Sequence, residues 1–383
     1  MDTQNTPIHI SLWHADFWIL AIANLLITMS VYMLIPVLPV WMFSVAGLSQ
    51  HEVGIVMGAY GIGLFVFGGF CNWYVQRYRR NRVCLWAMVG VFFALLGCWL
   101  VENEMQQSWL QYRLLLFLRI VLGAAFGLVQ MVLSSTLIID KSESFQRTEA
   151  NHASAWFGRF ALSLGPMLGI VFARTTFSPL LASSILALAA FILLATVKFP
   201  FRTPEDGVKR FSGDRFFLPE AKWLFVNLFL ICLSVGLLMS TQFTAMFYAM
   251  VMVGFCVALL AERFAFVDAD LRSQVVAGSI LIAIALVMIL TRKQMIVNYI
   301  SPVLVGLGVG LIGSRFLLFF IKLSKHCQRG TAVSTYMLSW ESGLATGLFV
   351  GYFFFADQIR LALSASLACI MLAFALYVLF THQ

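Results

Sequence analysis

Charge is the scarcest feature of this sequence. Asp, Glu, Lys and Arg make up 11% of its 383 residues, while hydrophobic residues make up 61%. A soluble globular domain carries a charge at about a quarter of its positions, so this composition excludes a soluble fold. Long polar segments are also missing, and no stretch between the hydrophobic runs is long enough to fold as a separate domain. We therefore expect almost the whole chain to lie in a membrane.

Clusters of metal ligands and catalytic groups are missing as well. The seven cysteines are scattered without a CxxC pair, which favours neither a disulfide framework nor a metal site. The six histidines fall at the ends of hydrophobic runs, in loops or near the termini, and no buried Ser/His/Asp set or phosphate-binding loop is recognisable. The sequence therefore predicts no enzymatic activity, no cofactor and no bound metal.

Hydrophobic runs long enough to cross a bilayer fill most of the chain. A transmembrane helix needs about 20 apolar residues. Twelve runs qualify, at about 17–40, 52–75, 83–101, 112–138, 150–173, 178–198, 222–242, 243–264, 273–291, 297–321, 331–355 and 358–380. Only Ser240, Thr241 and Gln242 interrupt the apolar sequence between the seventh and eighth runs, so ten or eleven spans are also compatible. No cleavable signal peptide is evident, and we expect the first run to remain as a span.

The basic residues indicate how the chain crosses the membrane. Most of the 25 Lys and Arg residues lie on the side shared by the two termini and by the loop 199–221. The positive-inside rule places that side in the cytoplasm. The net charge of +8 is thus explained by topology, and we expect no nucleic-acid partner. The prediction is a monomeric, multi-pass protein of the inner (plasma) membrane, with both termini cytoplasmic and the lipid bilayer around it.

The chain divides into two related halves. Its longest polar stretch, residues 199–221, separates residues 1–198 from residues 222–383, with six spans on each side. A shift of 182 residues places Arg147 on Arg329 and Arg159 on Glu341, with glycines in the same register. We therefore expect an all-α integral membrane fold of two six-helix, pseudo-symmetric bundles joined by a cytoplasmic linker.

Three charged residues lie inside the predicted spans and are the first candidates for function. Glu341 is the only acidic residue deep within a span, and Arg159 lies at the equivalent depth in the other half. Arg119 lies in the fourth span. A charge at this depth costs ~3 kcal/mol on insertion scales, so it seldom occurs without a role. Burial favours a neutral carboxyl and a nearby arginine favours a charged one, which would make Glu341 a protonation switch. The alternative is a structural ion pair between helices.

Polar residues recur on spans 1, 4, 7 and 10, one span from each three-helix unit. In span 1 they are spaced at i, i+4, which places them on one helix face. This recurrence favours an aqueous cavity, while hydrogen bonding between helices is the alternative for any single residue. The predicted cavity-lining residues are Asn24, Thr28, Tyr32, Gln130, Asn227 and Ser234.

Several short motifs resemble those of the major facilitator superfamily. The loop at 72–82 is similar to the family's GxxxDRxGRRx signature, although Asn72 and Arg79 replace its two glycines and Gln76 replaces its acid. The stretch from Asp140 to Arg147 resembles the family's linker between spans 4 and 5. Glu262 and Arg263 stand at the matching end of span 8. This resemblance implies a cytoplasmic gate formed by Arg77, Arg80, Asp140, Arg147, Glu262 and Arg263.

Two further motifs resemble sequences of proton-coupled members of that superfamily. Arg119 and Gly123 match its RxxxG pattern, and Gly165 to Gly169 resembles the GPxxG element of drug/proton antiporters, with Ile170 in place of the following glycine. The resemblance implies a twelve-helix transporter with alternating access and proton-coupled efflux of a small molecule. In that reading Glu341 binds the proton, and Arg119 and Arg159 set its affinity or hold an anionic group of the substrate. Uptake or uniport of an organic anion and a non-transporting membrane sensor are the alternatives.

Overall fold

All regular elements in the described part of the chain are helical. The computed structural model describes residues 12–105, 107–143, 145–199, 207, 209–266, 270–292 and 294–380. The elements are α1 (Ala15–Tyr32), α2 (Leu34–Ser44), α3 (Gln50–Val66), η1 (Gly68–Phe70), α4 (Cys71–Arg77), α5 (Arg80–Glu104), α6 (Ser108–Val132), the π-helical η2 (Leu133–Leu137), α7 (Ile138–Asp140), α8 (Arg147–Phe172), α9 (Pro179–Thr196), η3 (Pro219–Ala221), α10 (Lys222–Met239), α11 (Ala245–Phe264), α12 (Leu271–Thr291), α13 (Val297–Leu323), η4 (His326–Gln328), α14 (Arg329–Phe355) and α15 (Ile359–Phe380).

The helices form twelve membrane spans. Eleven are long and apolar enough by composition alone, once consecutive pieces such as α1 and α2 are joined. The twelfth is α14, which has 27 residues but carries Glu341 and many serine, threonine and glycine residues. Its side chains are buried along nearly its whole length, so its polar groups face protein and not lipid. The prediction of an all-α fold with twelve spans is confirmed.

The uncertain boundary between the seventh and eighth spans is a turn between α10 and α11. Gln242 adopts a left-handed conformation there, with φ 56°. This conformation is uncommon for a residue with a side chain, and turns that need it usually contain glycine or asparagine. The turn therefore carries neither of the residues that normally mark one, which is why the sequence left the boundary open.

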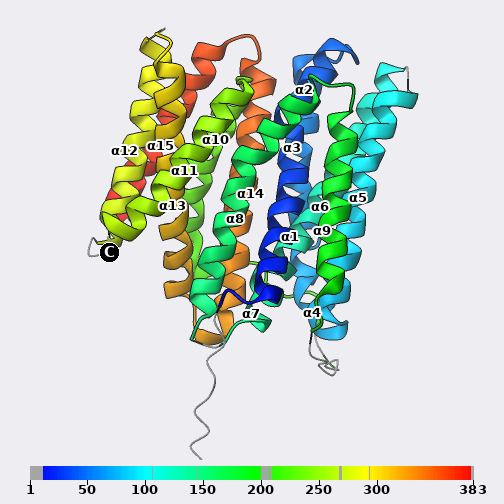
Figure 1. The fold of residues 1–383 in the computed structure, drawn as a ribbon, viewed down its shortest axis with the longest axis vertical. Coiled ribbons are helices and arrows are strands. Elements are labelled where there is room, and N and C mark those ends of the chain that lie inside the picture. The colour runs from blue at the N-terminus through cyan, green and yellow to red at the C-terminus, as the bar shows by residue number, and fades with distance from the viewer. Residues whose placement is uncertain are drawn as a thin grey trace, which may run out of the picture.

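Two bundles, α1–α9 and α10–α15, lie side by side, with α8 and α14 near the boundary between them in the view of Figure 1. Equivalent helices pack in equivalent ways. A Cβ atom added to Gly165 of α8 would lie 2.9 Å from the carbonyl oxygen of Met29 in α1, and one added to Gly347 of α14 would lie 2.3 Å from that of Leu233 in α10. Backbones this close require glycine. The repeat seen in the sequence is therefore a repeat of packing, although the linker boundaries at 199 and 221 stay a prediction.

A tight seam joins the two bundles where α3 meets α14. Added Cβ atoms on Gly54, Gly58 and Gly61 of α3 would lie 2.7–2.9 Å from Phe353, Phe349 and Ala345 of α14. This seam runs toward the end of the molecule that carries α2. The opposite end carries α4 and α7 and is the lower end in Figure 1. We call it the basic end, because Arg80, Arg147 and Arg329 begin their helices there.

The first and fourth spans, which both contribute to the site, are interrupted. The first breaks at Met33, between α1 and α2. Pro36 explains this break, since it has no N–H to donate to the Tyr32 carbonyl and its ring crowds the preceding turn. The fourth span contains the π-helical η2, which places Ser134, Ser135 and Thr136 next to one another. Such π segments often occur at functional sites, and η2 lies against α14 and α8.

Candidate functional site

A closed cavity lies between the two bundles, and the repeat defines its walls. Five residues of α8 and five of α14 line it, and each pair is related by the 182-residue shift. The α8 residues are Asn151, Ser154, Ala155, Gly158 and Arg159, and their α14 equivalents are Val333, Tyr336, Met337, Trp340 and Glu341. Residues of α1, η2 and α13 complete the wall. The cavity volume is about 20 Å³, so it holds little more than a water molecule in this conformation.

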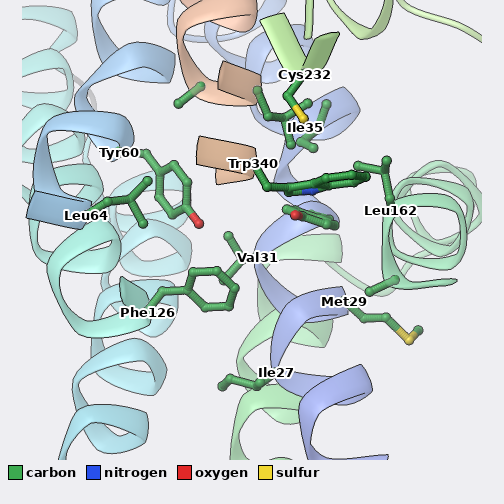
Figure 2. Packing of buried hydrophobic residues seen from close by; sticks show 14 of the residues in the cluster. Ile27, Met29, Val31, Ile35, Tyr60, Leu64, Phe126, Leu162, Cys232 and Trp340 are labelled. Atoms are coloured by element: carbon green, nitrogen blue, oxygen red, sulfur yellow. The ribbon is translucent and has the colours of Figure 1, made fainter. Parts of the chain in front are cut away.

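Glu341 links the two bundles through two tyrosines. Its side chain belongs to α14 and is 2% exposed. The Tyr32 hydroxyl from the end of α1 donates to Oε1, and the Tyr60 hydroxyl from α3 donates to Oε2 at 2.9 Å. In Figure 2, Tyr60 and Trp340 lie at the same level of the bundle, with Val31 and Phe126 beneath them. The carboxyl is therefore hydrogen-bonded on both oxygens, and buried aromatic side chains lie beside it.

Arg159 lines the same cavity, and in the part of the chain that the structure describes it forms no ion pair. It is 2% exposed, its Nη1 donates to the Ser314 hydroxyl at 2.8 Å, and its guanidinium carbon lies 4.5 Å from the ring centroid of Trp156. Its Nε and Nη2 atoms are buried and have no hydrogen-bond partner. Buried donors of this kind cost free energy unless something accepts from them, so the cavity presents an unsatisfied cation.

Arg119 lies beside the site and contacts Tyr60. It is 3% exposed and donates to the carbonyl oxygens of Val56 at 3.4 Å and Met57 at 3.3 Å. Its guanidinium carbon lies 5.1 Å from the Tyr60 ring centroid. Among the described residues, no ion pair joins Glu341 to either Arg119 or Arg159. The structural ion pair considered from the sequence is thus not the arrangement found.

The polar residues of spans 1 and 4 form one network at the cavity. Gln130 Nε2 donates to Asn24 Oδ1 at 3.1 Å and to Thr28 Oγ1 at 3.0 Å. Asn24 Nδ2 donates in turn to the carbonyl oxygen of Ser154 at 3.2 Å. Asn24, Thr28 and Tyr32 line the cavity, and Gln130 lies behind them and fixes their orientation.

The polar residues of span 7 lie elsewhere. Asn227 donates to the carbonyl oxygen of Ala373 at 2.8 Å, and Ser234 exchanges hydrogen bonds with Ser366. Both partners belong to α15. These contacts join two helices of the C-terminal bundle, which is the alternative that the sequence left open for single polar residues. Asn227 and Ser234 are not among the residues that line the closed cavity.

The residues expected to form a gate are divided between two places. Arg80 and Asp140 form an ion pair at 2.9 Å and line a larger cavity at the basic end, together with Arg147. Glu262 lies 3.6 Å from His152 of α8, across the contact between α8 and α11. Arg263 is exposed beside Phe264. Arg77 ends α4. The structure therefore brings together Arg80, Asp140 and Arg147, while Glu262 and Arg263 lie apart from them.

Sequence reasoning missed several residues of the site. Tyr60 was not singled out, although it bonds Glu341 and lies under Arg119. Tyr336 and Trp340 of α14 were also not singled out. The repeat could have identified these two residues. The 182-residue shift pairs them with Ser154 and Gly158, which lie on the same face of α8 as Arg159. Tyr60 had no comparable signal, since its place depends on how α3 rotates against α14.

Comparison with known proteins places this geometry in context. The sequence model of one protein family, the Major Facilitator Superfamily, matches residues 20–348 of this chain. The sequence matches none of the curated proteins with which it was compared. The fold is similar to that of the xylose transporter XylE from E. coli, with a TM-score of 0.70 at 13% identity over 95% of this chain and 98% of that chain.

Two other solved structures have a similar fold. The human organic anion transporter MFSD10 (TETRAN) gives a TM-score of 0.69 at 14% identity, covering 94% of this chain and 98% of that chain. A bacterial homologue of the iron transporter ferroportin, in an outward-facing state, gives 0.67 at 13% identity, covering 97% of this chain and 100% of that chain. At these identities the similarity establishes the fold and leaves the substrate open.

Proposed function

Because this chain belongs to the major facilitator superfamily, we propose that it cotransports a small organic anion with a proton by alternating access. Membership of the family and its twelve spans make it a multi-pass membrane transporter and not an enzyme. The substrate class, the proton and the direction are the proposal. The main support for this proposal is one observation. Arg159 and Glu341 line one cavity at equivalent positions of the two bundles, and they do not form an ion pair with each other.

Arg159 supplies the binding site for the anion. Two of its guanidinium nitrogens are buried without an acceptor, and a carboxylate or similar group would satisfy both. A guanidinium presents its donors in the geometry that a carboxylate accepts. The cavity is too small for a substrate as it stands, so we propose that it widens when the bundles move apart at one end.

Glu341 couples the binding of the proton to the binding of the anion. A negative carboxylate in this cavity repels an anion, whereas a neutral carboxyl does not. Burial disfavours the charge, and the two tyrosine hydroxyls that donate to the carboxyl favour it, so the balance can be shifted by solvent access. Protonation therefore favours anion binding, and the two ligands move in the same direction.

A screen of purified protein by ligand-induced thermal shift tests the substrate class. The compounds are divided into organic anions, organic cations and neutral amphiphiles. A ligand at 100 times its Kd stabilises the folded state by ~2.7 kcal/mol. We expect stabilisation by organic anions, with a larger shift at lower pH. Stabilisation by cations alone would contradict the proposal.

Proton-driven export remains the second candidate, because one observation favours it. The GPxxG-like element of α8 packs against the break between α1 and α2, where an added Cβ on Gly165 would lie 3.1 Å from the Cβ of Tyr32. This element thus lies beside a residue that holds Glu341. In export by antiport, the substrate and the proton would move in opposite directions, and this difference separates the two candidates.

We also propose that the basic end faces the cytoplasm, because positively charged loops are retained there. A reporter fused to either terminus, or inserted within residues 203–214, should then read as cytoplasmic. Folding of each fusion is checked by its monodispersity in detergent. A periplasmic signal from any of the three would overturn this orientation.

The ion pair between Arg80 and Asp140 predicts that loss of Arg80 makes the basic end more accessible. Both side chains are largely buried, with exposures of 19% and 14%, and a pair at such a place contributes ~1 kcal/mol. Arg80→Ala should therefore increase access to this end about fivefold and slow transport, with normal expression. Modification of Cys327, which lines the cavity there, measures access.

The matched control is Arg82→Ala, which removes an exposed arginine of the same helix turn. It should leave access and transport unchanged. If Arg80→Ala also leaves both unchanged, Arg80 and Asp140 have no part in closing this end.

A further inference from the structure

A second cavity, which we call the basic vestibule, opens at the basic end. Its volume is about 280 Å³, and four arginines line it: Arg80, Arg147, Arg215 and Arg329. They come from the start of α5, the start of α8, the linker and the start of α14. Asn151 lines both this vestibule and the closed cavity that contains Glu341, so the two spaces are neighbours.

Fewer acidic than basic side chains line the vestibule. Asp140 is the one acidic residue that lines it, and Asp140 pairs with Arg80 at 2.9 Å. Among the described residues, no ion pair involves Arg147, Arg215 or Arg329. The Nε atoms of Arg147 and Arg215 are buried and have no hydrogen-bond partner. Burial and the Arg80 charge lower the pKa of the Arg215 guanidinium, and the nearby Asp214 and Asp140 only partly oppose this shift.

Two long helices add to the positive potential. Arg147 and Arg329 are the first residues of α8 and α14, which have 26 and 27 residues. A helix N-terminus carries about half a positive charge, so an arginine at this position destabilises the helix unless an anion is near. The two arginines are related by the 182-residue shift, so the same unfavourable placement occurs in both bundles.

The linker connects this vestibule to both bundles. The Arg215 side chain donates to the Thr136 hydroxyl of η2 at 3.3 Å, and its backbone N–H donates to the Thr331 hydroxyl of α14 at 2.9 Å. Asp214 accepts a hydrogen bond from that same Thr331 hydroxyl. Arg215 is therefore held over the vestibule by contacts to each half.

We propose that the basic vestibule is a second anion site, which takes a phosphate-type dianion between Arg147, Arg215 and Arg329. A dianion with tetrahedral oxygens can accept from several guanidinium groups at once. A lipid headgroup carries the same chemistry, but the vestibule adjoins the closed cavity and is lined by both bundles and the linker, which favours a free anion. This site is separate from Arg159 and does not require proton coupling.

Cys327 provides a probe inside the vestibule. It is exposed and lines the vestibule, whereas four of the other six cysteines are buried and Cys256 and Cys369 lie within membrane spans. A water-soluble, negatively charged methanethiosulfonate should therefore modify Cys327 selectively. The experiment measures this rate for the full protein in phosphatidylcholine nanodiscs, with inorganic phosphate added at constant ionic strength against chloride.

We expect phosphate to slow the modification of Cys327 in a saturable way. The Arg147→Gln/Arg329→Gln double variant should need at least about tenfold more phosphate for the same protection, since it removes two charged donors to the anion. Arg210→Gln is the matched control, because Arg210 is exposed on the same linker and does not line the vestibule. It should behave as the wild type.

Three results would overturn this site. The first is a modification rate that phosphate slows no more than chloride does. The second is unchanged protection in the double variant, or in the single variants if the double variant is not monodisperse. The third is protection that appears only in nanodiscs containing phosphatidylglycerol, which would assign the arginines to a lipid headgroup. None of these results bears on anion binding at Arg159, which the thermal-shift screen measures separately.

Discussion

Glu341→Gln should give a well-folded protein that still binds its anion but no longer couples transport to protons. The glutamine side chain can accept from Tyr32 and donate to Tyr60, so both hydrogen bonds to the α14 side chain can be kept. No arginine loses a partner, because Glu341 is not paired with Arg119 or Arg159. Had it been paired, the change would cost ~3–5 kcal/mol and the protein would fold poorly.

Transport in proteoliposomes shows whether coupling is lost. Wild-type uptake of the anion should rise as the external pH falls, because protonation of Glu341 removes its repulsion of the anion. The Gln variant should lose this pH dependence and accumulate no anion in response to a pH gradient. Exchange of labelled for unlabelled anion should survive, since it requires no net proton movement. Glu104→Gln, which changes an exposed acid at the end of α5, is the control.

Two outcomes would contradict this role. A monodisperse Gln variant with full pH-dependent accumulation would move the coupling site away from α14. A variant that fails to fold would show that the carboxylate is needed for stability, and that Tyr32 and Tyr60 are not its only important partners.

Arg159→Gln should weaken anion binding about 10- to 100-fold, which corresponds to the ~1.5–3 kcal/mol of a charge-assisted hydrogen bond. The binding measurement is the thermal shift by the anion that the screen identifies, converted to a Kd by titration. Stability without ligand should fall little, because the change removes a hydrogen bond to Ser314 and the contact with Trp156, but no ion pair.

Two further variants separate charge from geometry at this position. Arg159→Lys keeps the charge but loses the planar set of donors, so it should recover only part of the affinity. Ser314→Ala keeps Arg159 and removes the hydroxyl that accepts from its Nη1, so it should leave binding intact or improve it. Unchanged affinity in Arg159→Gln would exclude Arg159 as the ligand of the anion.

Much of the fold could be predicted from two features of the sequence. The lengths of the hydrophobic runs indicate the spans, and the internal repeat indicates the two bundles. The 182-residue shift paired Arg159 with Glu341, and the structure places both on one cavity. The shift also predicted the glycine contacts of α8 and α14, since Gly165 and Gly347 each face a neighbouring backbone. These features depend on position along the chain, which the sequence contains.

Helix rotation could not be predicted in the same way. Asn24 and Asn227 occupy similar places in spans 1 and 7, yet Asn24 faces the cavity and Asn227 bonds to α15. The polar residues of α10 are few, and both Asn227 and Ser234 bond to α15, so the hydrophobic pattern of α10 does not show which of its faces would line a cavity. Tyr60 was missed for a related reason, because an apolar, glycine-rich face of α3 gives no sign of the carboxyl that it meets.

The direction in which protons move with the anion tests the central claim most directly. Protein is reconstituted into vesicles that contain a pH-sensitive dye, and an inward gradient of the identified anion is imposed without a pH gradient. We predict that the vesicle interior becomes more acidic, that Glu341→Gln abolishes this change, and that Arg159→Gln requires more anion to produce it. An interior that becomes more alkaline would establish antiport, and an interior whose pH does not change while the anion enters would show that protons are not coupled at all.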